Sequence, residues 1–472
     1  MENGGRTAAE NYEEKIKEYV LARAAGGLPT GVTVLTFGCQ QNEADSEKLL
    51  GLAATLGFSP TDDPQDAGLI LINTCAIREH AEQKVLSVIG GFGRRKAGDH
   101  GLLIGVCGCM PAQAHRIEQL KKSYPYVDFS LDPASLPRMA EAIGTRLFHG
   151  KRSFFVGEEA PPIDEGVIPL RRRGPLGWLS IMYGCNNFCS YCIVPYVRGR
   201  ERSRSSADII REAEEMIAAG YRDITLLGQN VNSYRGDCDF ATLLSRLAAL
   251  PGDFRIRFMT SHPKDVSDDL IRVIGECPKI APAFHLPLQS GSNAVLHAMN
   301  RRYTMERYRE TVRKLRNARP GIVLTSDIIV GFPGESDEDF AETLRALEEI
   351  RFDMVYSFLY SPRRGTPAAG YDWQISAEVK GERMRRLLDL QTGIASAIGK
   401  TYEGKTLRVL AEEVSKTDPD MLTGRTDGGK PVHFPAEPSL IGEFLSVKIE
   451  RADAYAMYGT PVGLSTRNEQ NQ

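Results

Sequence analysis

Residues 184–192 read Gly-Cys-Asn-Asn-Phe-Cys-Ser-Tyr-Cys, so three cysteines share one short loop with the spacing C-x3-C-x2-C. Thiolates are the ligands of iron–sulfur clusters, and three at this spacing can bind three irons of a [4Fe–4S] cluster. The fourth iron then has no protein ligand and stays open to a small molecule. Zinc is the alternative, but its sites usually take four nitrogen or sulfur ligands, and no fourth ligand is adjacent in the sequence. The loop predicts that Cys185, Cys189 and Cys192 bind a cluster with one open iron.

Strand and helix patterns alternate around this loop, from residue 177 to about residue 400. The expected strands are 178–183, 223–228, 254–259, 282–286, 322–330 and 353–360, and a helical pattern follows each of them. Six consecutive units of this kind predict parallel strands in a partial barrel, with the site at the C-terminal ends of the strands. The cysteine loop directly follows the first strand, which is such a place.

The preceding region, residues 31–149, also alternates short apolar strands with helices. Strands are expected at 32–37, 68–73 and 102–106, and helices at 45–56 and 77–96. Short apolar strands separated by helices predict a parallel α/β sheet.

Three more cysteines follow the strands of this first sheet. Cys39, Cys75 and Cys109 each lie where a strand ends. Parallel strands bring their C-terminal ends to one edge of a sheet, so these thiols are expected to converge. Convergence alone leaves open whether they bind a second cluster or are buried structural cysteines. Cys107 could replace Cys109, because residues i and i+2 share a face of a strand, but a glycine precedes both Cys39 and Cys109 and favours Cys109.

Composition shifts along the chain predict an α/β protein of several parts. A linker rich in proline, glycine and charge separates two α/β regions, and short strands divided by Gly and Pro make the last region a small all-β barrel. The expected boundaries are an N-terminal extension at 1–30, the α/β domain at 31–149, the linker at 150–176, the partial (β/α)6 barrel at 177–400, the small barrel at 401–466 and a tail at 467–472.

Length and composition predict the cellular location of the protein. It has 472 residues, a formal net charge of −3 and nine cysteines. No apolar run reaches the roughly 18 residues that span a membrane, and no secretory signal pattern is present. An odd number of cysteines without such a signal favours ligands over disulfides. We therefore expect a soluble, cytoplasmic protein with no membrane partner.

Positive charge is local. Residues 171–204 hold seven arginines and one acidic residue. Arg198, Arg200, Arg202 and Arg204 alternate, so in an extended segment they form a basic strip on one side, which suits phosphate groups. A solvated loop explains the same pattern, so the strip is one of two interpretations.

Several motifs together resemble the radical S-adenosylmethionine methylthiotransferase family. The first region carries Gly38-Cys39-Gln40-Gln41-Asn42, Asn73-Thr74-Cys75 and Gly108-Cys109-Met110, which are similar to the three cysteine motifs of that family. The middle region adds the loop at 184–192, His285-Leu286-Pro287-Leu288-Gln289-Ser290-Gly291-Ser292 and the segment from Ser326 to Glu335. The small barrel expected at 401–466 resembles a TRAM domain, an RNA-binding β-barrel. The resemblance covers about residues 31–466.

The resemblance implies an enzyme with two [4Fe–4S] clusters and S-adenosylmethionine as cofactors. The cluster at Cys185, Cys189 and Cys192 generates a 5′-deoxyadenosyl radical, which removes hydrogen from C2 of N6-isopentenyladenosine at position 37 of tRNA. The auxiliary cluster at Cys39, Cys75 and Cys109 presents or donates sulfur, and a second S-adenosylmethionine donates the methyl group. No acid or base residue is required, and none is assigned.

The resemblance also implies ligand contacts. The S-adenosylmethionine contacts are expected at Tyr191, Gln229, Asn230, Gln289, Ser290, Asp327 and Glu335. In residues 401–472, whose eight basic and eleven acidic side chains do not suit RNA as a whole, a local patch is expected at Arg425, Lys430 and Phe434, with Phe434 stacking on a base.

The implied partners are the tRNA anticodon stem-loop, an electron donor such as flavodoxin or ferredoxin, and proteins that assemble or repair iron–sulfur clusters, with the enzyme itself a monomer. Relatives of similar architecture modify threonylcarbamoyladenosine in tRNA or an aspartate of a ribosomal protein, and these are alternative substrates. A non-catalytic iron–sulfur protein that binds RNA or senses redox state is the alternative of a different class.

Overall fold

The computed structural model describes residues 6–76, 79–157, 166–171 and 174–463. The chain divides into two compact units. The first contains Met1–Arg172, Tyr183–Asn186 and Cys192–Arg202, and the second contains Arg173–Met182, Asn187–Tyr191 and Ser203–Gln472. Each unit is described by itself.

The first unit is built on a six-stranded sheet in which every strand pairing is parallel. Its strands, in spatial order, are β2 (Ser59–Pro60), β1 (Gly31–Thr36), β3 (Ala67–Thr74), β4 (Leu103–Gly108), β5 (Phe129–Leu131) and β6 (Ser153–Phe155). The order reverses after β1, since β2 lies on one side of it and β3 on the other. Ligand sites of such sheets form at the C-terminal strand ends beside a reversal of this kind.

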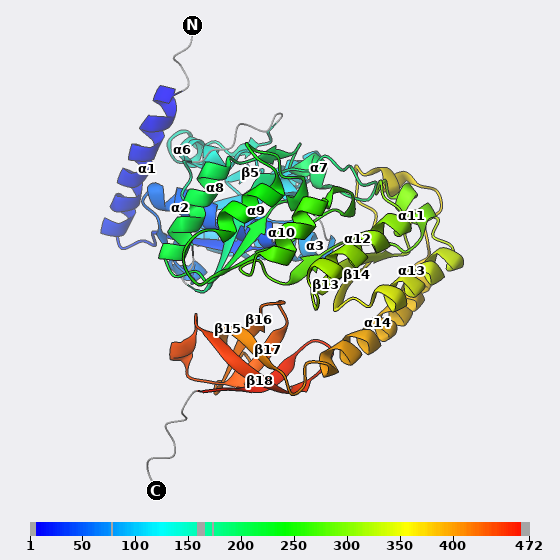
Figure 1. Ribbon diagram of the computed structural model, residues 1–472. Coiled ribbons are helices and arrows are strands. Elements are labelled where there is room, and N and C mark those ends of the chain that lie inside the picture. Colours follow the sequence, from blue (N-terminus) through cyan, green and yellow to red (C-terminus); the bar gives the residue numbers. More distant parts are fainter. Residues whose placement is uncertain (1–5, 77–78, 158–165, 172–173, 464–472) are drawn as a thin grey trace. The chain divides into compact units, whose positions relative to one another are not determined.

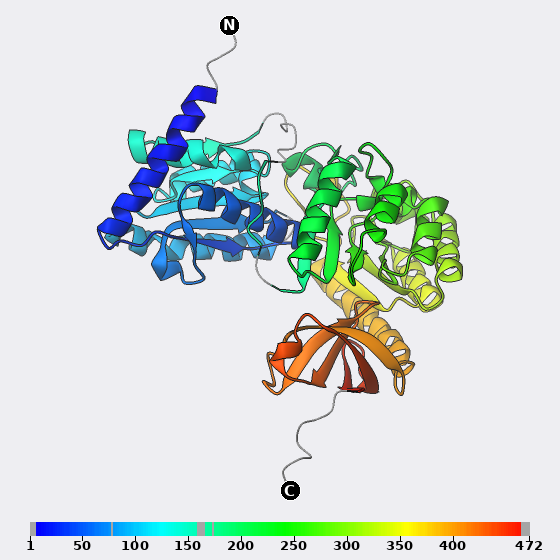
Figure 2. The same ribbon diagram turned by 60° about the vertical axis from the view of Figure 1, so that its left-hand side comes forward.

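Helices cover both faces of this sheet (Figure 2). Core residues of α1 (Arg6–Ala25), α2 (Gln40–Thr55) and α6 (Met139–His149) pack on one face. Core residues of α3 (Glu79–Gly91) and α5 (Ala114–Ser123) pack on the other. Because both faces are buried, β3 and β4 are continuous apolar runs rather than alternating ones. The predicted parallel α/β region is confirmed, although the helix expected at 77–96 is two helices in its described part, α3 and α4 (Gly93–Gly98).

The second unit contains the partial barrel, which consists of two three-stranded parallel sheets (Figure 1). They are formed by β7 (Leu176–Ser180), β10 (Asp223–Leu227) and β11 (Arg255–Phe258), and by β12 (Ala283–His285), β13 (Val323–Val330) and β14 (Met354–Leu359). These six strands are the six expected from the sequence, with bounds that differ by a few residues at most. The alternating helices are α8 (Ser206–Ala218), α9 (Phe240–Ala248), α10 (Asp268–Glu276), α11 (Asn293–Ala298), α12 (Met305–Ala318) and α13 (Asp337–Ile350).

Local sequence sets where these helices begin. A serine, threonine or aspartate side chain accepts a hydrogen bond from a backbone N–H of the first turn, which satisfies a donor that the helix leaves unpaired. This holds at Ser205, Asp239, Ser267, Ser292, Thr304 and Ser336. The caps fix the strand-to-helix loops, which carry the candidate site residues.

The second unit ends in a long helix and a small barrel. After α14 (Ala377–Lys400) the chain forms a closed five-stranded barrel, as the sequence predicts (Figure 1). Its strands are β15 (Thr406–Val414), β16 (Met421–Thr426), β17 (Pro431–Pro435), β18 (Phe444–Ala452) and β19 (Met457–Pro461). Among the described helices, none combines the length and apolarity that crossing a bilayer requires.

The short elements complete the chain. They are α7 (Val194–Val197), β8 (Met182–Tyr183), β9 (Arg202–Ser203) and the 3-10 turns η1 (Pro64–Asp66), η2 (Met110–Ala112), η3 (Leu136–Arg138), η4 (Val231–Ser233), η5 (Pro263–Asp265), η6 (Pro367–Gly370) and η7 (Pro438–Leu440).

Candidate metal centres

Cys39, Cys75 and Cys109 come together at the C-terminal edge of the first sheet. Cys39 precedes α2 and follows β1, Cys75 follows β3, and Cys109 follows β4. The pKa of the Cys109 thiol is raised to about 12, first by burial and then, against an opposing effect of Arg198, by the neighbouring Cys75 and Cys39. The three thiols therefore lie close enough to affect one another's charge, as the strand-end argument predicts.

Two glycines allow this close approach. Gly38 has φ +141°, and a Cβ on it would lie 2.8 Å from the Cβ of Cys75. Gly108 has φ +91°, and a Cβ there would lie 2.4 Å from the backbone oxygen of Thr74. Only glycine adopts such a backbone conformation without strain in so little space. The glycine that precedes each of these cysteines is thus a steric requirement of the site.

Cys107 lies within β4 and packs into the core on one face of the sheet, whereas Cys109 follows the end of that strand. The Cys107 side chain is fully buried in the core beneath α2 and α6, whereas Cys109 packs with Ala76, Ile193 and Val197. Burial alone raises the pKa of the Cys107 thiol. The geometry therefore gives Cys107 a packing role and leaves Cys109 with Cys39 and Cys75.

A polar network surrounds the three thiols. Cys39 Sγ donates to Asn42 Oδ1 at 3.3 Å, and Asn42 Nδ2 donates to Asn73 Oδ1 and to the Thr74 carbonyl. Arg198 Nε donates to Cys109 Sγ at 3.2 Å, while its Nη2 lies 2.8 Å from Asp45 Oδ2. Arg198 is only 7% exposed, so this guanidinium belongs to the site.

The loop at 184–192 has residues in both units, so its cysteines are described separately. Cys185 is buried in the first unit, and its backbone N–H donates to the Gly199 carbonyl at 3.1 Å. Gly184 has φ +74°, and a Cβ there would lie 2.0 Å from the Arg200 carbonyl oxygen. Cys192 is half-buried in the same unit.

Cys189 is buried in the second unit, where the segment Ala298–Tyr303 supports the loop; we call this segment the cradle. The Ser190 hydroxyl and backbone N–H donate to the Ala298 and Met299 carbonyls, respectively. Asn300 Nδ2 donates to the Phe188 carbonyl at 2.9 Å and to the Asn187 carbonyl at 3.3 Å.

The backbone is strained where the loop meets the cradle. Phe188 has φ +47° and Asn300 has φ +57°, in the left-handed region that residues other than glycine rarely occupy. Asparagine tolerates this region better than most residues. The hydrogen bonds from Asn300 therefore hold a loop conformation that the loop sequence alone does not favour.

Arg301 reaches the cysteine loop from the cradle. Its Nη1 donates to Cys189 Sγ at 3.5 Å, its Nη2 donates to the Pro287 carbonyl at 2.9 Å, and it is 4% exposed. No carboxylate pairs with Arg301 in the part of the chain that the structure describes. A buried, unpaired cation is costly and calls for an anionic neighbour, which three thiolates on a cluster supply.

Across the described ranges, no three His, Cys, Asp or Glu side chains are grouped as ligands of a single metal ion. A [4Fe–4S] cluster makes a different demand, because each of the three cysteines binds a different iron and the ligands therefore lie farther apart than around a single ion. The convergent thiols, their glycine turns and the adjoining arginines fit that demand.

Two of the expected S-adenosylmethionine contacts are buried amides with an unused acceptor. Asn230 is 1% exposed and Gln289 is 7% exposed, after β10 and β12. Asn230 Nδ2 donates to Asp265 Oδ2 at 2.8 Å. Neither Asn230 Oδ1 nor Gln289 Oε1 has a hydrogen-bond partner among the described residues. Because buried polar atoms are normally paired, both oxygens fit a ligand that donates hydrogen bonds, such as an amino group.

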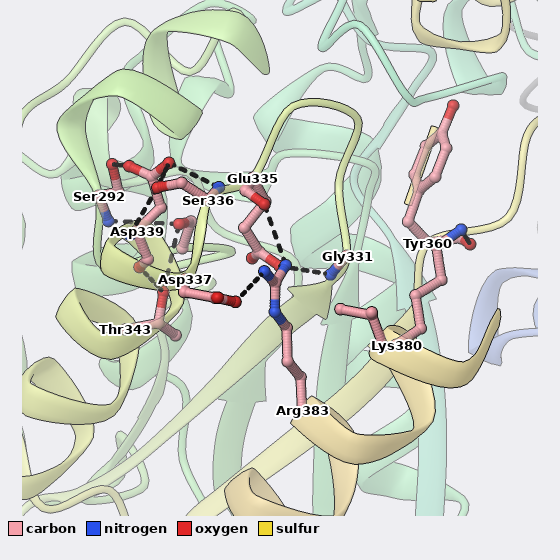
Figure 3. Close-up of polar contacts among 12 residues, drawn as sticks. Ser292, Gly331, Glu335, Ser336, Asp337, Asp339, Thr343, Tyr360, Lys380 and Arg383 are labelled. Atoms are coloured by element: carbon pink, nitrogen blue, oxygen red, sulfur yellow. Dashed lines mark hydrogen bonds and ion pairs between the residues drawn. The ribbon is translucent and has the colours of Figure 1, made fainter. Parts of the chain in front are cut away.

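Ser290 and Glu335 have structural roles. The Ser290 hydroxyl lies 3.3 Å from Thr343 Oγ1 and accepts from the Ser292 N–H. Glu335 Oε2 accepts from the Gly331 N–H at 2.8 Å and pairs with Arg383 at 2.7 Å (Figure 3). Burial raises the pKa of Glu335, against the effects of Gly331 and Arg383. These contacts turn both side chains toward the protein and shape the Gly331–Glu335 turn.

The other three expected contacts keep some exposure. Tyr191 packs beside Met299, Phe332 and Tyr360. Gln229 is half-buried, and Asp327 is 26% exposed with Oδ2 at 3.6 Å from His285 Nε2.

The predicted basic strip is wrong for two of its four arginines. Arg198 lies at Cys109, and Arg204 is 5% exposed, pairs with Glu212 at 2.6 Å and donates to the Ser180 carbonyl. Burial removes both from contact with phosphate. Arg200 is exposed, and Arg202 is half-buried with its guanidinium over the Tyr183 ring.

The predicted patch on the small barrel is also corrected. Phe434 is 0% exposed in the barrel core, so it cannot stack on a base. Lys430 pairs with Asp353 at 2.7 Å and is 15% exposed. Arg425 is 46% exposed while it pairs with Glu412 at 2.8 Å, which leaves it as the accessible member of the patch.

The sequence interpretation assigned no role to Asp45, Asn300 or Arg301, although each contacts a cysteine set. Asp45 lies three residues after Asn42 of the first cysteine motif, which is the signal that could have found it, whereas Asn300 lies outside the quoted motifs. Arg301 precedes α12, which begins at Met305, and lies in the cradle.

Three family models match parts of the chain. The radical SAM superfamily matches residues 179–347, the uncharacterized protein family UPF0004 matches 31–132, and the TRAM domain matches 400–462. The solved structure of TsrM, a radical S-adenosylmethionine methyltransferase from Kitasatospora setae, is similar in fold, with a TM-score of 0.54 at 16% identity over 72% of this chain and 77% of that one.

Curated relatives match nearly the whole chain. Proteins named tRNA-2-methylthio-N(6)-dimethylallyladenosine synthase are 47% identical in Acetivibrio thermocellus, over 90% of both chains, and 48% identical in Alkaliphilus oremlandii, over 90% of this chain and 91% of the relative. One from Carboxydothermus hydrogenoformans is 43% identical over 91% of this chain and 98% of the relative.

Proposed function

This chain belongs to the family of the tRNA-2-methylthio-N(6)-dimethylallyladenosine synthases, and we propose that it replaces the C2 hydrogen of N6-isopentenyladenosine at position 37 of tRNA with a methylthio group. Isopentenyl and dimethylallyl denote the same substituent here. The enzyme class is a radical S-adenosylmethionine transferase of a sulfur-containing group.

The observation that carries the proposal is the presence of two separate cysteine sets in one chain. The C-x3-C-x2-C loop is one set, and the convergent Cys39, Cys75 and Cys109 are the other. Insertion of sulfur at an unactivated carbon needs two things, a strong hydrogen-abstracting agent and a source of sulfur. Two cluster sites supply one place for each.

The thiols of each set would bind one [4Fe–4S] cluster through three irons. When bound, the cluster at the loop and S-adenosylmethionine together supply a 5′-deoxyadenosyl radical, a second S-adenosylmethionine supplies the methyl group, and the other cluster supplies sulfur. The protein's part is to bind and orient. Asn42 and Arg198 hold Cys39 and Cys109, and Asn300 and Arg301 hold the loop around Cys189.

For S-adenosylmethionine, the oxygens of Asn230 and Gln289 are the acceptors best placed for a donor group. We propose Tyr191, Gln229 and Asp327 as further contacts, because they follow strand ends and keep some exposure. Ser290 and Glu335 act indirectly, since their hydrogen bonds set the turns that approach the ligand.

The partner supported by this assignment is the tRNA anticodon stem-loop, and the family match at residues 400–462 to the TRAM domain supports RNA contact by the small barrel. Arg200, Arg202 and Arg425 are the candidate phosphate contacts that keep exposure. A one-electron donor such as flavodoxin or ferredoxin and cluster-assembly or repair proteins complete the set, and we place the enzyme in the cytoplasm as a monomer.

Nucleoside analysis tests the substrate. We expect tRNA from a strain that lacks the gene to lose 2-methylthio-N6-isopentenyladenosine and accumulate N6-isopentenyladenosine in liquid chromatography–mass spectrometry. Complementation with the wild-type gene restores the modification. Unchanged 2-methylthio-N6-isopentenyladenosine overturns the proposal, and loss of the methylthio derivative of threonylcarbamoyladenosine or of the ribosomal-protein aspartate identifies an alternative substrate.

In vitro chemistry separates the enzyme from a non-catalytic iron–sulfur protein. The anaerobically reconstituted chain is expected to contain about eight irons, the content of two [4Fe–4S] clusters. With a reductant it is expected to form 5′-deoxyadenosine from S-adenosylmethionine. A redox sensor binds iron without forming that product.

A further inference from the structure

Each of the two cysteine sets has one buried arginine in contact with a cysteine sulfur. Arg198 contacts Cys109 at 3.2 Å and Arg301 contacts Cys189 at 3.5 Å. The two arginines lie on segments far apart in the sequence and in different compact units. The same local arrangement at both sites points to a shared role toward the sulfur ligands.

The partners of the two arginines differ in charge. Arg198 pairs with Asp45 at 2.8 Å, and both side chains are at most 5% exposed. That pair leaves little net charge beside Cys109. The carboxylate also receives a hydrogen bond from Gln41, which holds it in place.

Arg301 has only neutral partners besides the cysteine. Its Nη2 donates to the Pro287 carbonyl at 2.9 Å, and its Nε donates to the Tyr303 hydroxyl at 3.4 Å. The Tyr303 hydroxyl in turn donates to the Leu288 carbonyl at 2.6 Å. Within the described chain no carboxylate neutralises this guanidinium, so a full positive charge lies beside Cys189.

Such a charge acts strongly on a neighbouring redox centre. A buried charge interacts through a lower effective dielectric than one in water. Net charge and hydrogen bonds to the sulfurs are among the factors that set the reduction potential of an iron–sulfur cluster. Reduction adds one negative charge to the cluster. A nearby cation therefore raises the reduction potential, whereas an arginine–aspartate pair changes the potential little.

We propose that Arg301 is a positioning residue that raises the reduction potential of the cluster at Cys185, Cys189 and Cys192, while the Arg198–Asp45 pair holds the Cys109 sulfur without a comparable shift. The asymmetry directs an incoming electron to the cysteine loop. The step is the transfer of one electron from a low-potential donor protein, with no bond formed or broken. The inference rests on the proposed function for the presence of both clusters.

Redox titration of single-cluster variants tests this. The potential of the loop cluster is measured in the parent variant Cys39→Ala/Cys75→Ala/Cys109→Ala, which keeps only the loop cysteines. The potential of the other cluster is measured in the parent variant Cys185→Ala/Cys189→Ala/Cys192→Ala. Each is reconstituted as the full chain, and its midpoint potential is followed by electron paramagnetic resonance without S-adenosylmethionine or tRNA. We expect Arg301→Gln to make reduction at the loop about tenfold less favourable, about 59 mV for a one-electron couple.

Three matched variants complete the test. Arg301→Lys keeps the charge and is expected to stay close to its parent. Arg302→Gln removes the adjacent exposed arginine, which contacts Asn300 rather than a cysteine, and is expected to leave the potential unchanged. At the other site, Arg198→Gln/Asp45→Asn removes both charges at once and is expected to change the potential little.

Unchanged potential in Arg301→Gln, an equal shift in Arg302→Gln, or an equal shift in Arg198→Gln/Asp45→Asn overturns the inference. If Arg301→Gln takes up no iron, the reduction potential of Arg301→Lys tests the inference instead. A potential equal to that of the parent supports the role of charge, and reduction that is tenfold less favourable contradicts it. Failure of the proposed function is separate, because it shows as missing nucleoside product in wild-type enzyme, whereas these potentials are measured without substrate.

Discussion

The two cysteine sets are built in opposite ways. Cys39, Cys75 and Cys109 are far apart in the sequence and meet because three parallel strands end at one edge of a sheet. Cys185, Cys189 and Cys192 are neighbours on one loop, whose middle part is held by the cradle at Ala298–Tyr303. The first set depends on the topology of a whole sheet, and the second depends on local spacing and a few hydrogen bonds.

This difference predicts different sensitivity to change. Cysteines at strand ends are held in place by the buried core on both faces of the sheet. Such a set should therefore lose its cluster when the backbone at a strand end is displaced. A loop has fewer buried contacts and relies on individual polar bonds, each of which contributes modestly. Substitutions should therefore separate the two sites by mechanism.

Removal of either set has the largest expected effect. Each triple alanine variant should lose about four irons, the content of one cluster. Cys185→Ala/Cys189→Ala/Cys192→Ala should abolish 5′-deoxyadenosine formation, whereas Cys39→Ala/Cys75→Ala/Cys109→Ala should retain it and lose only the methylthio product. Iron analysis and chromatography of both products check this.

Cys107→Ala is the matched control for that comparison. Because Cys107 packs in the core of one sheet face and not with the three convergent thiols, its loss should leave iron content unchanged and cost about 1 kcal/mol of stability. Iron loss equal to that of Cys109→Ala would show that the two cysteines are exchanged in the site.

The fold and the cysteine sets were predictable from sequence for physical reasons. Short apolar runs and helix caps report local structure, and all six barrel strands lie where the pattern placed them. Parallel topology then brings Cys39, Cys75 and Cys109 to one edge whatever the side-chain details. The first set could therefore be predicted from the topology, and the loop could be predicted from the cysteine spacing alone.

Substitution of the glycines that precede Cys39 and Cys109 should have the next largest effect. Gly38→Ala and Gly108→Ala introduce a Cβ within 3 Å of neighbouring atoms at positive φ. Backbone strain alone costs about 1–3 kcal/mol at such positions. We expect iron loss at the first set with 5′-deoxyadenosine formation retained, as measured by iron analysis and chromatography.

Gly150→Ala controls for backbone strain without crowding. Gly150 has φ +67° at the end of α6, and no atom lies within 4 Å of its expected Cβ. This variant should lose some stability and keep its iron. Equal iron loss in Gly150→Ala would attribute the effect to general instability of the first unit.

The arginines show where sequence reasoning fails. Arg198 and Arg204 alternate with two other arginines and look like a surface strip, but each is buried against an acid, Asp45 or Glu212. Asp45 is 153 residues away from Arg198, so no local pattern shows the pairing. Phe434 differs, because it shares a strand face with the buried Val432, and alternation could have placed it in the core.

Loosening the loop should have a smaller effect. Asn300→Ala removes the hydrogen bonds to the Asn187 and Phe188 carbonyls, worth about 1 kcal/mol each, and keeps the strained φ. Asn300→Gly removes the same bonds but relieves the backbone. We expect both variants to lose iron from the loop faster under chelator than wild type, and Asn300→Ala faster than Asn300→Gly.

That order tests whether hydrogen bonds or backbone geometry dominates. If Asn300→Gly matches wild type, relief of the strain at φ +57° offsets the loss of the hydrogen bonds, and if it holds iron longer than wild type, the strain outweighs them. Iron at Cys39, Cys75 and Cys109 should be unaffected in either variant, which the triple variant lacking the loop cysteines measures directly.

The smallest expected effect is a pH dependence of stability that arises from His262, next to the cradle. His262 is 3% exposed, its ring lies 5.6 Å from the Tyr303 ring, and its Nδ1 accepts from the Lys264 N–H. Burial, followed by the charges of Arg301, Lys264 and Arg302, lowers the pKa of His262 below its usual value. The folded protein therefore keeps the imidazole neutral.

The sign follows from proton uptake. Below about pH 6.5, the ordinary value for histidine, the unfolded chain binds a proton that the folded chain does not. Stability should thus fall by up to about 1.4 kcal/mol per pH unit on acidification. Thermal unfolding at pH 7.5 and 5.5 measures this, and His262→Gln should show a smaller loss than wild type. An identical pH dependence in the variant would mean that the acid sensitivity of the second unit arises elsewhere than beside the loop's cradle.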